Sequence, residues 1–141
     1  MKYVLDASVA VRWVLPTPQR AKALKLRTEH RQQIHELIAP SHFTGEIASA
    51  LTKAERQKLV AVGEARRLTS DIHNSAPDLY PYEALLWRAI DISSQTRSSL
   101  YDCLYVALAE REGCPMVTAN EKLLRNLQRT FPFIISLASL P

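Results

Sequence analysis

Cysteine is scarce in this sequence, which excludes a disulfide framework and a cysteine-based zinc site as ways of stabilising a small protein. Only Cys103 and Cys114 are present, one inside a helical pattern and one after a glycine. They do not form a disulfide framework, so we expect free thiols in a reducing cytoplasm. The four histidines have no cysteine partner at zinc-site spacing, and we expect them at the surface: His30, His35, His42 and His73.

Long apolar runs are also missing. No stretch approaches the roughly 20 residues that a membrane span requires, and Met1 leads into a predicted strand without the pattern of a signal peptide. We find no internal repeat and no low-complexity linker. The 141 residues, 47% hydrophobic and 23% charged, therefore predict one globular domain over 1–141 with no membrane contact.

Positive charge exceeds negative charge only modestly. Eighteen Lys and Arg against fourteen Asp and Glu give a net charge of +4, which is compatible with a polyanionic partner but does not establish one. The basic residues gather in a polar helical stretch at 20–31 and at the end of another, at 53–58. Each cluster could equally be a solvated helix face.

Strand and helix patterns alternate along the chain. The predicted strands are 3–5, 37–39, 78–82, 116–118 and 133–136, with 78–82 at best an edge strand because it contains Pro81. The predicted helices are 9–15, 19–37, a segment capped by Ser41, 62–73, 83–96, 100–109 and one ending near Leu127. We expect Trp13 and Trp87 mainly in the core. Alternation of this kind predicts an α/β fold, with a central parallel sheet of four to five short strands covered on both faces.

Asp6 interrupts an apolar run near the start of the chain. The segment KYVLDASVAV begins as a buried strand and then places a carboxylate where more hydrocarbon would be expected. One interpretation is that Asp6 or Ser8 caps a helix beginning near Val9. The other is that the carboxylate belongs to a site at the end of the strand.

Asp102 is a second isolated charge. It is the only charged residue in 100–109, and its neighbours at helical spacing are apolar or aromatic, so it faces the packed side. A first-turn acid beside a Ser98 or Ser99 cap would be placed in the same way. The sequence around Asp102 leaves both interpretations open.

Glu46 and Asn120 complete a set of polar groups that the topology brings together. Glu46 borders the apolar stripe of a predicted helix, and Asn120 follows a predicted strand, where Asn is usually a turn or cap residue. In a parallel sheet, strand ends and the helices that follow them share one crevice, so these two residues can join Asp6 and Asp102. Three carboxylates would repel one another without a cation, and oxygen ligands suit Mg²⁺ or Mn²⁺.

Four segments together resemble the PIN-domain nucleases, and among them the VapC-like toxins of toxin–antitoxin pairs. These are YVLDASVAVRWVL, APSHFTGEIASAL, SSLYDCLYVALAEREGCPMVTAN and the closing strand, in this order over nearly the whole chain. The resemblance implies a PIN-like three-layer α/β/α fold. It implies three acidic residues that are catalytic and bind metal, with two supporting hydroxyls: Asp6, Glu46, Asp102, Ser8 and Thr118. The family usually has a further Asp where this chain has Asn120, a departure that bears on a second metal site.

The resemblance also implies an activity and partners. It predicts an Mg²⁺- or Mn²⁺-dependent endoribonuclease in which the cation polarises the scissile phosphate and activates water, leaving a 5′-phosphate. It predicts a toxin bound by a small antitoxin, and a homodimer. Arg12, Lys122 and Arg125 would hold the RNA backbone near the crevice.

Two other functions compete with this one. A degenerate PIN domain would bind RNA or a protein without cleaving, and Asn120 would then mark the decay of the site. A phosphate-accepting receiver domain would need an acidic pair at the first strand and a Lys ending the last, and the sequence has neither.

Overall fold

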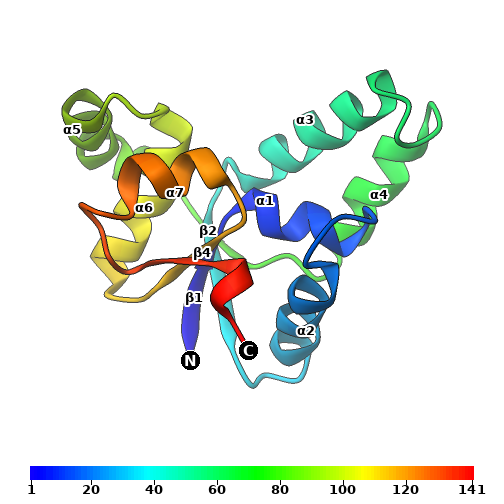
Figure 1. The fold of residues 1–141 in the computed structure, drawn as a ribbon, viewed down its shortest axis with the longest axis horizontal. Helices are drawn as coiled ribbons and strands as arrows, with labels where there is room; N and C mark the ends of the chain where they lie inside the picture. Colours follow the sequence, from blue (N-terminus) through cyan, green and yellow to red (C-terminus); the bar gives the residue numbers. More distant parts are fainter.

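A five-stranded parallel sheet forms the centre of the protein, as the computed structural model of residues 1–141 shows (Figure 1). The strands are β1 (Lys2–Leu5), β2 (Glu36–Pro40), β3 (Asp78–Tyr80), β4 (Met116–Thr118) and β5 (Ile134–Ser136). Their order across the sheet is β3-β2-β1-β4-β5, and every neighbouring pair is parallel. The predicted parallel sheet is confirmed, and β3 is the edge strand that Pro81 implied.

Seven α-helices cover the two faces of the sheet. They are α1 (Ala7–Ala10), α2 (Arg20–Arg31), α3 (Phe43–Arg56), α4 (Glu64–His73), α5 (Leu86–Thr96), α6 (Leu100–Glu112) and α7 (Glu121–Leu127). Three short 3₁₀ segments, η1 (Val11–Trp13), η2 (Tyr82–Leu85) and η3 (Leu137–Ser139), complete the fold. Helices α1–α4 lie on one side and α5–α7 on the other (Figure 1). Right-handed crossovers require this arrangement, because the chain crosses the sheet in one direction from β1 to β3 and in the opposite direction afterwards.

Helix α6 is the central core element. All of its residues from Cys103 to Ala109 are buried, and they pack with the strands into one apolar cluster. The helix ends at Gly113, whose φ of 63° is in the left-handed region that favours glycine at this position. The prediction that residues 100–109 pack on all sides is confirmed for 103–109, whereas Tyr101 at the start of the helix is 54% exposed. Both cysteines are buried free thiols.

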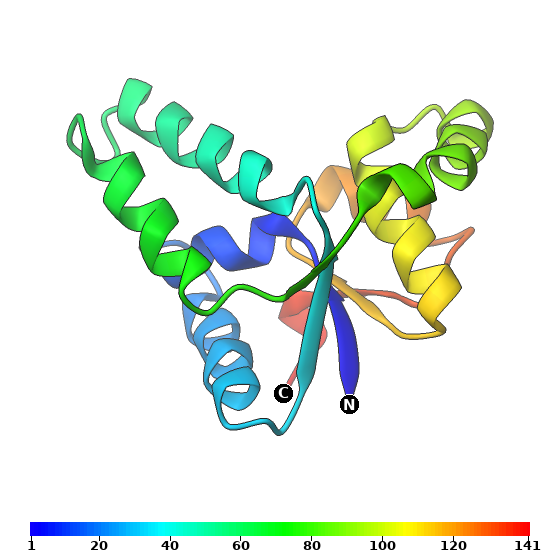
Figure 2. The ribbon, with the colours of Figure 1, turned by 180° about the vertical axis from the view of Figure 1, so that it is seen from behind.

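Helices α3 and α4 form a hairpin that projects from the sheet, as Figure 2 shows from behind. The Glu55 carboxylate accepts hydrogen bonds from Gly63 N at 3.1 Å and Ala65 N at 2.6 Å, so it satisfies free donors at the start of α4. Leu59 and Val62 at the tip of the hairpin are 67% and 91% exposed.

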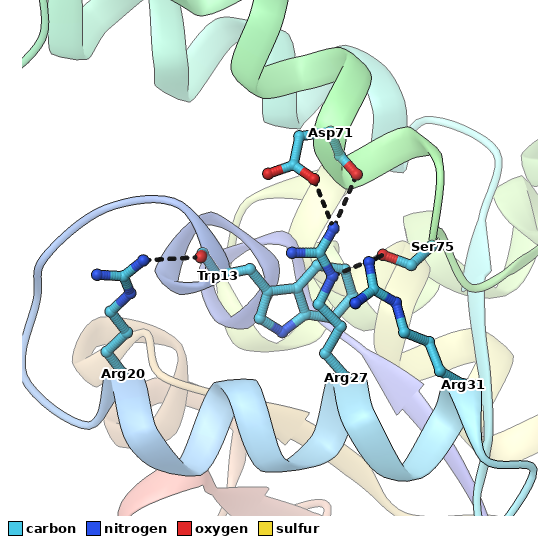
Figure 3. A network of polar contacts seen from close by, with 6 residues as sticks. All are labelled: Trp13, Arg20, Arg27, Arg31, Asp71 and Ser75. Atoms are coloured by element: carbon cyan, nitrogen blue, oxygen red, sulfur yellow. Dashed lines mark hydrogen bonds and ion pairs between the residues drawn. The ribbon is translucent and has the colours of Figure 1, made fainter.

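The base of the hairpin is tied to α2 by a buried arginine (Figure 3). Arg27 is 6% exposed, donates to Ser75 Oγ at 2.6 Å and Asp71 O at 2.8 Å, and lies 4.9 Å from the centre of the Trp13 ring. Because all of these partners are buried or half-buried, the network fixes α4 against α2 and the segment after α1.

The end of one predicted helix and the predicted cap of another are wrong. The helix expected over 19–37 ends at Arg31, because Gln33 takes a positive φ of 61° and the apolar residues that follow form the buried strand β2. Ser41 does not cap α3. Its hydroxyl instead accepts a hydrogen bond from Tyr82 N at 3.0 Å, which joins the ends of β2 and β3.

Two expectations about side-chain exposure also differ from the structure. Trp13 is buried as predicted, but Trp87 is 79% exposed on the outer side of α5. His42 was expected at the surface, yet its side chain is only 8% exposed, because it packs among tyrosine rings. None of the helices has the length and apolar character needed to span a bilayer.

Candidate active site

The predicted acidic residues come together at the carboxyl end of the sheet. Leu5 lies opposite Val117 in the β1–β4 register, so the next residues along the two strands, Asp6 and Thr118, are neighbours. The chain leaves β1 over one face of the sheet, through α1, and leaves β4 over the other, through α7. Parallel sheets form ligand crevices at such a point. A cavity of about 180 Å³ opens at this point. Its polar lining residues are Asp6, Ser8, Glu46, Asp102 and Asn120.

Asp6 is both a helix cap and a buried acid. It precedes α1 in an extended conformation and accepts a hydrogen bond from Ser8 N at 3.3 Å, so the capping interpretation is correct. The side chain is nevertheless buried, and burial raises its pKa even though hydrogen bonds from Ser8 and Thr118 oppose the shift. A capping residue at a helix N-terminus does not need to be buried, so capping alone does not explain why the Asp6 side chain is buried.

Two hydroxyls hold Asp6 in place. Ser8 Oγ and Thr118 Oγ1 both donate to Asp6 Oδ2, the second at 3.0 Å. Each hydroxyl also accepts a backbone N–H, from Ala119 at 2.9 Å for Ser8 and from Asn120 at 3.1 Å for Thr118. This network joins the ends of β1 and β4 and fixes the orientation of the carboxylate.

Glu46 and Asp102 lie in the first turns of α3 and α6. Burial and the charges of Asp6 and Asp102 raise the pKa of Glu46 to about 7, against the effect of a hydrogen bond from Tyr105. Burial and the charge of Asp6 raise the pKa of Asp102 to about 6, and Lys122 partly opposes this shift. The three carboxylates therefore affect one another, as groups sharing one crevice do.

No lysine or arginine forms an ion pair with these carboxylates; the nearest basic group is His42, 3.5 Å from Glu46. Three neighbouring carboxylates without an ion-pair partner are chemically suited to a hard divalent cation. However, no three His, Cys, Asp or Glu side chains are close enough to form a preformed metal cage. Mg²⁺ typically binds through one or two carboxylates and several waters, so the donor set fits Mg²⁺ or Mn²⁺ without such a cage.

Asn120 lines the crevice but uses its amide oxygen elsewhere. Oδ1 accepts hydrogen bonds from Lys122 N at 3.0 Å and Leu123 N at 3.2 Å, which caps α7. The alternative role weighed for Asn120, a helix cap, is thus present in the structure. An aspartate here could cap with one oxygen and present the other to the crevice, whereas the amide has a single oxygen.

The three basic residues predicted to bind RNA differ in their surroundings. Arg12 is partly buried, donates to Ser8 O at 2.7 Å and Pro18 O at 3.3 Å, and is close enough to Asp6 for the charge to affect its pKa. Lys122 and Arg125 are exposed on α7, and Lys122 is close enough to influence the pKa of Asp102.

Tyr105 and His42 are site neighbours that sequence reasoning missed. Tyr105 is fully buried, and its hydroxyl donates to Glu46 Oε1 at 2.7 Å. A tyrosine in a helix that is buried on all sides needs a partner for its hydroxyl, and this was the signal in the sequence that could have identified it. His42 packs 4.8 Å from the Tyr105 ring, and nothing in the sequence marked it.

A larger hollow of about 280 Å³ near the amino ends of the strands is a weaker candidate. Its only acidic side chain is already paired: Glu29 contacts His35 at 2.7 Å and Lys25 at 3.9 Å. In the smaller crevice, by contrast, none of the three carboxylates forms an ion pair with a lysine or arginine.

The fold and the crevice define a three-layer α/β protein with an acidic crevice at the switch point of its sheet. The family model of the PIN domain matches residues 3–128, and the chain belongs to this family. Ribonuclease VapC12 of Mycobacterium tuberculosis is 32% identical over 124 residues, covering 87% of this chain and 90% of that protein. Ribonuclease VapC3 of Pyrobaculum aerophilum is 27% identical over 138 residues, covering 96% and 99%.

Solved structures share the fold. The crystal structure of PAE2754 from Pyrobaculum aerophilum has a TM-score of 0.68 at 19% identity and covers 99% of this chain and 94% of that one. A toxin–antitoxin complex from Klebsiella pneumoniae has a TM-score of 0.61 at 11% identity, with 96% and 97% covered. These similarities confirm the predicted PIN-like three-layer architecture.

Asn120→Asp should tighten Mn²⁺ binding about tenfold. The aspartate would keep one oxygen as the helix cap and offer a second, charged oxygen to the cation, whereas the amide has only the oxygen that caps α7. Asp caps α7 as well as Asn does, and its charge is favourable at a helix N-terminus. Repulsion from the other acids should then lower the stability of the metal-free protein by no more than about 1 kcal/mol. Titration calorimetry and thermal melts measure both quantities.

The matched control for metal binding is Asn126→Asp, an exposed residue of the same helix, which should leave Mn²⁺ affinity unchanged. If Asn120→Asp leaves Mn²⁺ affinity unchanged, Asn120 acts only as the cap of α7.

Proposed function

We propose that the protein is an Mg²⁺- or Mn²⁺-dependent endoribonuclease and the toxin of a toxin–antitoxin pair. One observation supports this most directly: three carboxylates with raised pKa values line one crevice without a lysine or arginine partner. The relatives named Ribonuclease VapC, similar over nearly the whole chain, supply the substrate class.

Asp6, Glu46 and Asp102 would hold the cation, directly or through water. When bound, the cation supplies Lewis-acid polarisation of a phosphate and activation of water. The residues of the chain position that chemistry: Ser8 and Thr118 keep Asp6 oriented. Water adds to phosphorus, the bond to the 3′ oxygen breaks, and that oxygen takes a proton, so the products carry a 5′-phosphate and a 3′-hydroxyl.

The basic residues would hold the RNA backbone rather than read its sequence. Lys122 and Arg125 lie three residues apart on the exposed side of α7 and are free to contact phosphates. Arg12 is engaged with two backbone carbonyls, so a phosphate contact would have to share or replace those hydrogen bonds.

The test is cleavage of total RNA by the purified protein, freed of any partner, with and without Mg²⁺ or Mn²⁺. Cleavage that requires the metal and yields 5′-phosphate ends supports the proposal. RNA binding without cleavage at any metal concentration would instead support the second candidate, a degenerate PIN domain, for which Asn120 in place of the family's usual Asp is the motivating observation.

A cognate antitoxin should bind beside the crevice and present an Arg or Lys to the unpaired carboxylates.

The chain should also form a homodimer, and the apolar residues Trp87 and Ile90, one turn apart and exposed on α5, are candidates for buried interface surface. We expect expression of the chain alone to slow growth, and the pure protein to sediment as a dimer. A monomer that leaves growth unchanged would contradict both expectations.

A further inference from the structure

Tyr105 has an unusual position for a polar side chain. It lies in the middle of α6, has no exposed surface, and belongs to the apolar cluster that forms the core. Its hydroxyl nevertheless donates at 2.7 Å to Oε1 of Glu46, a residue that lines the crevice. This bond joins α6 to the first turn of α3, two helices on opposite faces of the sheet.

We propose that Tyr105 is a positioning residue of the metal site, which fixes Glu46 Oε1 so that Oε2 is the oxygen available to a cation or its waters. The proposal rests on the proposed function, because it assigns Tyr105 a role toward the same cation. The acidic residues alone do not imply this role. The proposal adds that Glu46 must be oriented by a hydrogen-bond donor from the core, the Tyr105 hydroxyl.

Glu46 needs such a donor because nothing else in the structure holds it firmly. Its side chain has three rotatable bonds and lies in the first turn of the projecting hairpin, so ordering it on binding would cost rotamer entropy. A carboxylate that is already hydrogen-bonded at one oxygen has lost that freedom before the cation arrives. Partners of this kind around metal ligands typically change metal affinity by about 10- to 100-fold.

His42 is the other polar group near Glu46, and it cannot replace Tyr105. Its Nε2 lies 3.1 Å from the Tyr101 carbonyl and 3.5 Å from Glu46 Oε1, so its proton is directed at the carbonyl. Burial lowers the pKa of His42, which keeps the ring neutral. The Tyr105 hydroxyl, by contrast, stays protonated, because burial and the nearby carboxylates raise its pKa well above the ordinary value.

The test uses Tyr105→Phe, which keeps the ring in the core and removes only the hydroxyl. We expect 10- to 100-fold weaker Mn²⁺ binding by titration calorimetry, and a similar rise in the Mn²⁺ concentration needed for half-maximal RNA cleavage. Activity should recover substantially at saturating Mn²⁺, since the carboxylates themselves are unchanged. The matched control is Tyr101→Phe, one turn earlier on the same helix and 54% exposed, which should leave Mn²⁺ affinity unchanged.

A double-mutant cycle with Glu46→Gln separates positioning from packing. If Tyr105 acts through Glu46, adding Tyr105→Phe to Glu46→Gln should weaken Mn²⁺ binding by less than about twofold, because the oriented carboxylate is already absent. Circular dichroism and thermal melts of each variant establish that the comparison is between folded proteins, and the cycle is read at a temperature below every melting point.

The outcomes distinguish the two proposals. Wild-type protein that binds no Mn²⁺ and cleaves no RNA would overturn the proposed function, and the role of Tyr105 with it. Wild-type protein that does both, with Tyr105→Phe binding Mn²⁺ equally well, would overturn only the role of Tyr105. Fully additive effects in the cycle would also overturn it, since the hydroxyl would then act independently of Glu46.

Discussion

Asp102→Asn should reduce metal-dependent RNA cleavage by at least about 100-fold while leaving the fold intact. The substitution keeps the shape of the side chain and removes the charge, so the loss falls on cation binding and on the chemistry that the cation supports. Because the pKa of Asp102 is about 6, the wild-type group is ionised at pH 7.5, where the assay is run. No hydrogen bond contributes to the pKa of the Asp102 carboxylate. An amide at this position therefore breaks no hydrogen-bond network that supports the fold.

The measurement is RNA cleavage over a range of Mg²⁺ and Mn²⁺ concentrations, together with a thermal melt of the metal-free protein. Asp91→Asn, an exposed acid on α5, is the matched control and should cleave like the wild type. Asp102→Asn should melt at the same temperature as the wild type or slightly above it, because one repelling charge is gone. Undiminished, metal-dependent cleavage by a well-folded Asp102→Asn protein would contradict the site described here.

The architecture and the acidic crevice could be predicted because the sequence marks them locally. Short apolar runs identified the strands, and a lone charge in the otherwise uncharged stretch 100–109 identified Asp102. Parallel topology then placed Asp6, Glu46 and Asp102 at one edge of the sheet, which the structure confirms as a shared cavity. Each of these steps depended on periodicity or on the position of a residue at a strand or helix end.

The features that were missed depend on contacts between distant segments. The end of α2 and the start of β2 are set by the burial of Leu37 in the centre of the sheet, which overrides the polar helical pattern before it. Ser41 bonds to the backbone near β3, which no local cap rule includes. The partner of Tyr105 is 59 residues away in the chain, so only the fold reveals which acid it holds.

The stability of the metal-free protein should fall as the pH rises from about 4 to about 7. Burial raises the pKa of Glu46 from 4.5 to about 7 and that of Asp102 from 3.8 to about 6, so the folded state binds protons more tightly than the unfolded state in this range. A group whose pKa is raised by folding contributes its full stabilisation below its unfolded pKa, and that contribution is lost as the pH rises through the folded pKa.

Each unit of pKa shift corresponds to about 1.4 kcal/mol of unfolding free energy. Because both side chains are partly exposed and their shifts are coupled, solvent screening reduces the combined effect to about 2 kcal/mol. Burial lowers the pKa of His42, which works in the opposite direction below about pH 6.5. We therefore compare the wild type with the double variant Glu46→Gln/Asp102→Asn, in which the contribution of His42 is retained and the carboxylate contribution is removed.

Chemical denaturation between pH 4 and pH 8 should show the wild type losing about 2 kcal/mol relative to this double variant, and nearly all of the loss should occur below pH 7.5. Under the proposed function Mn²⁺ would bind the carboxylates in their ionised form, so saturating Mn²⁺ should restore the stability of the wild type at pH 8 and have little effect at pH 5. It should not stabilise the double variant at either pH. If the metal-free wild type gains stability relative to the double variant as the pH rises, the carboxylates are compensated in a way that the crevice does not show, and no cation is needed to hold them together.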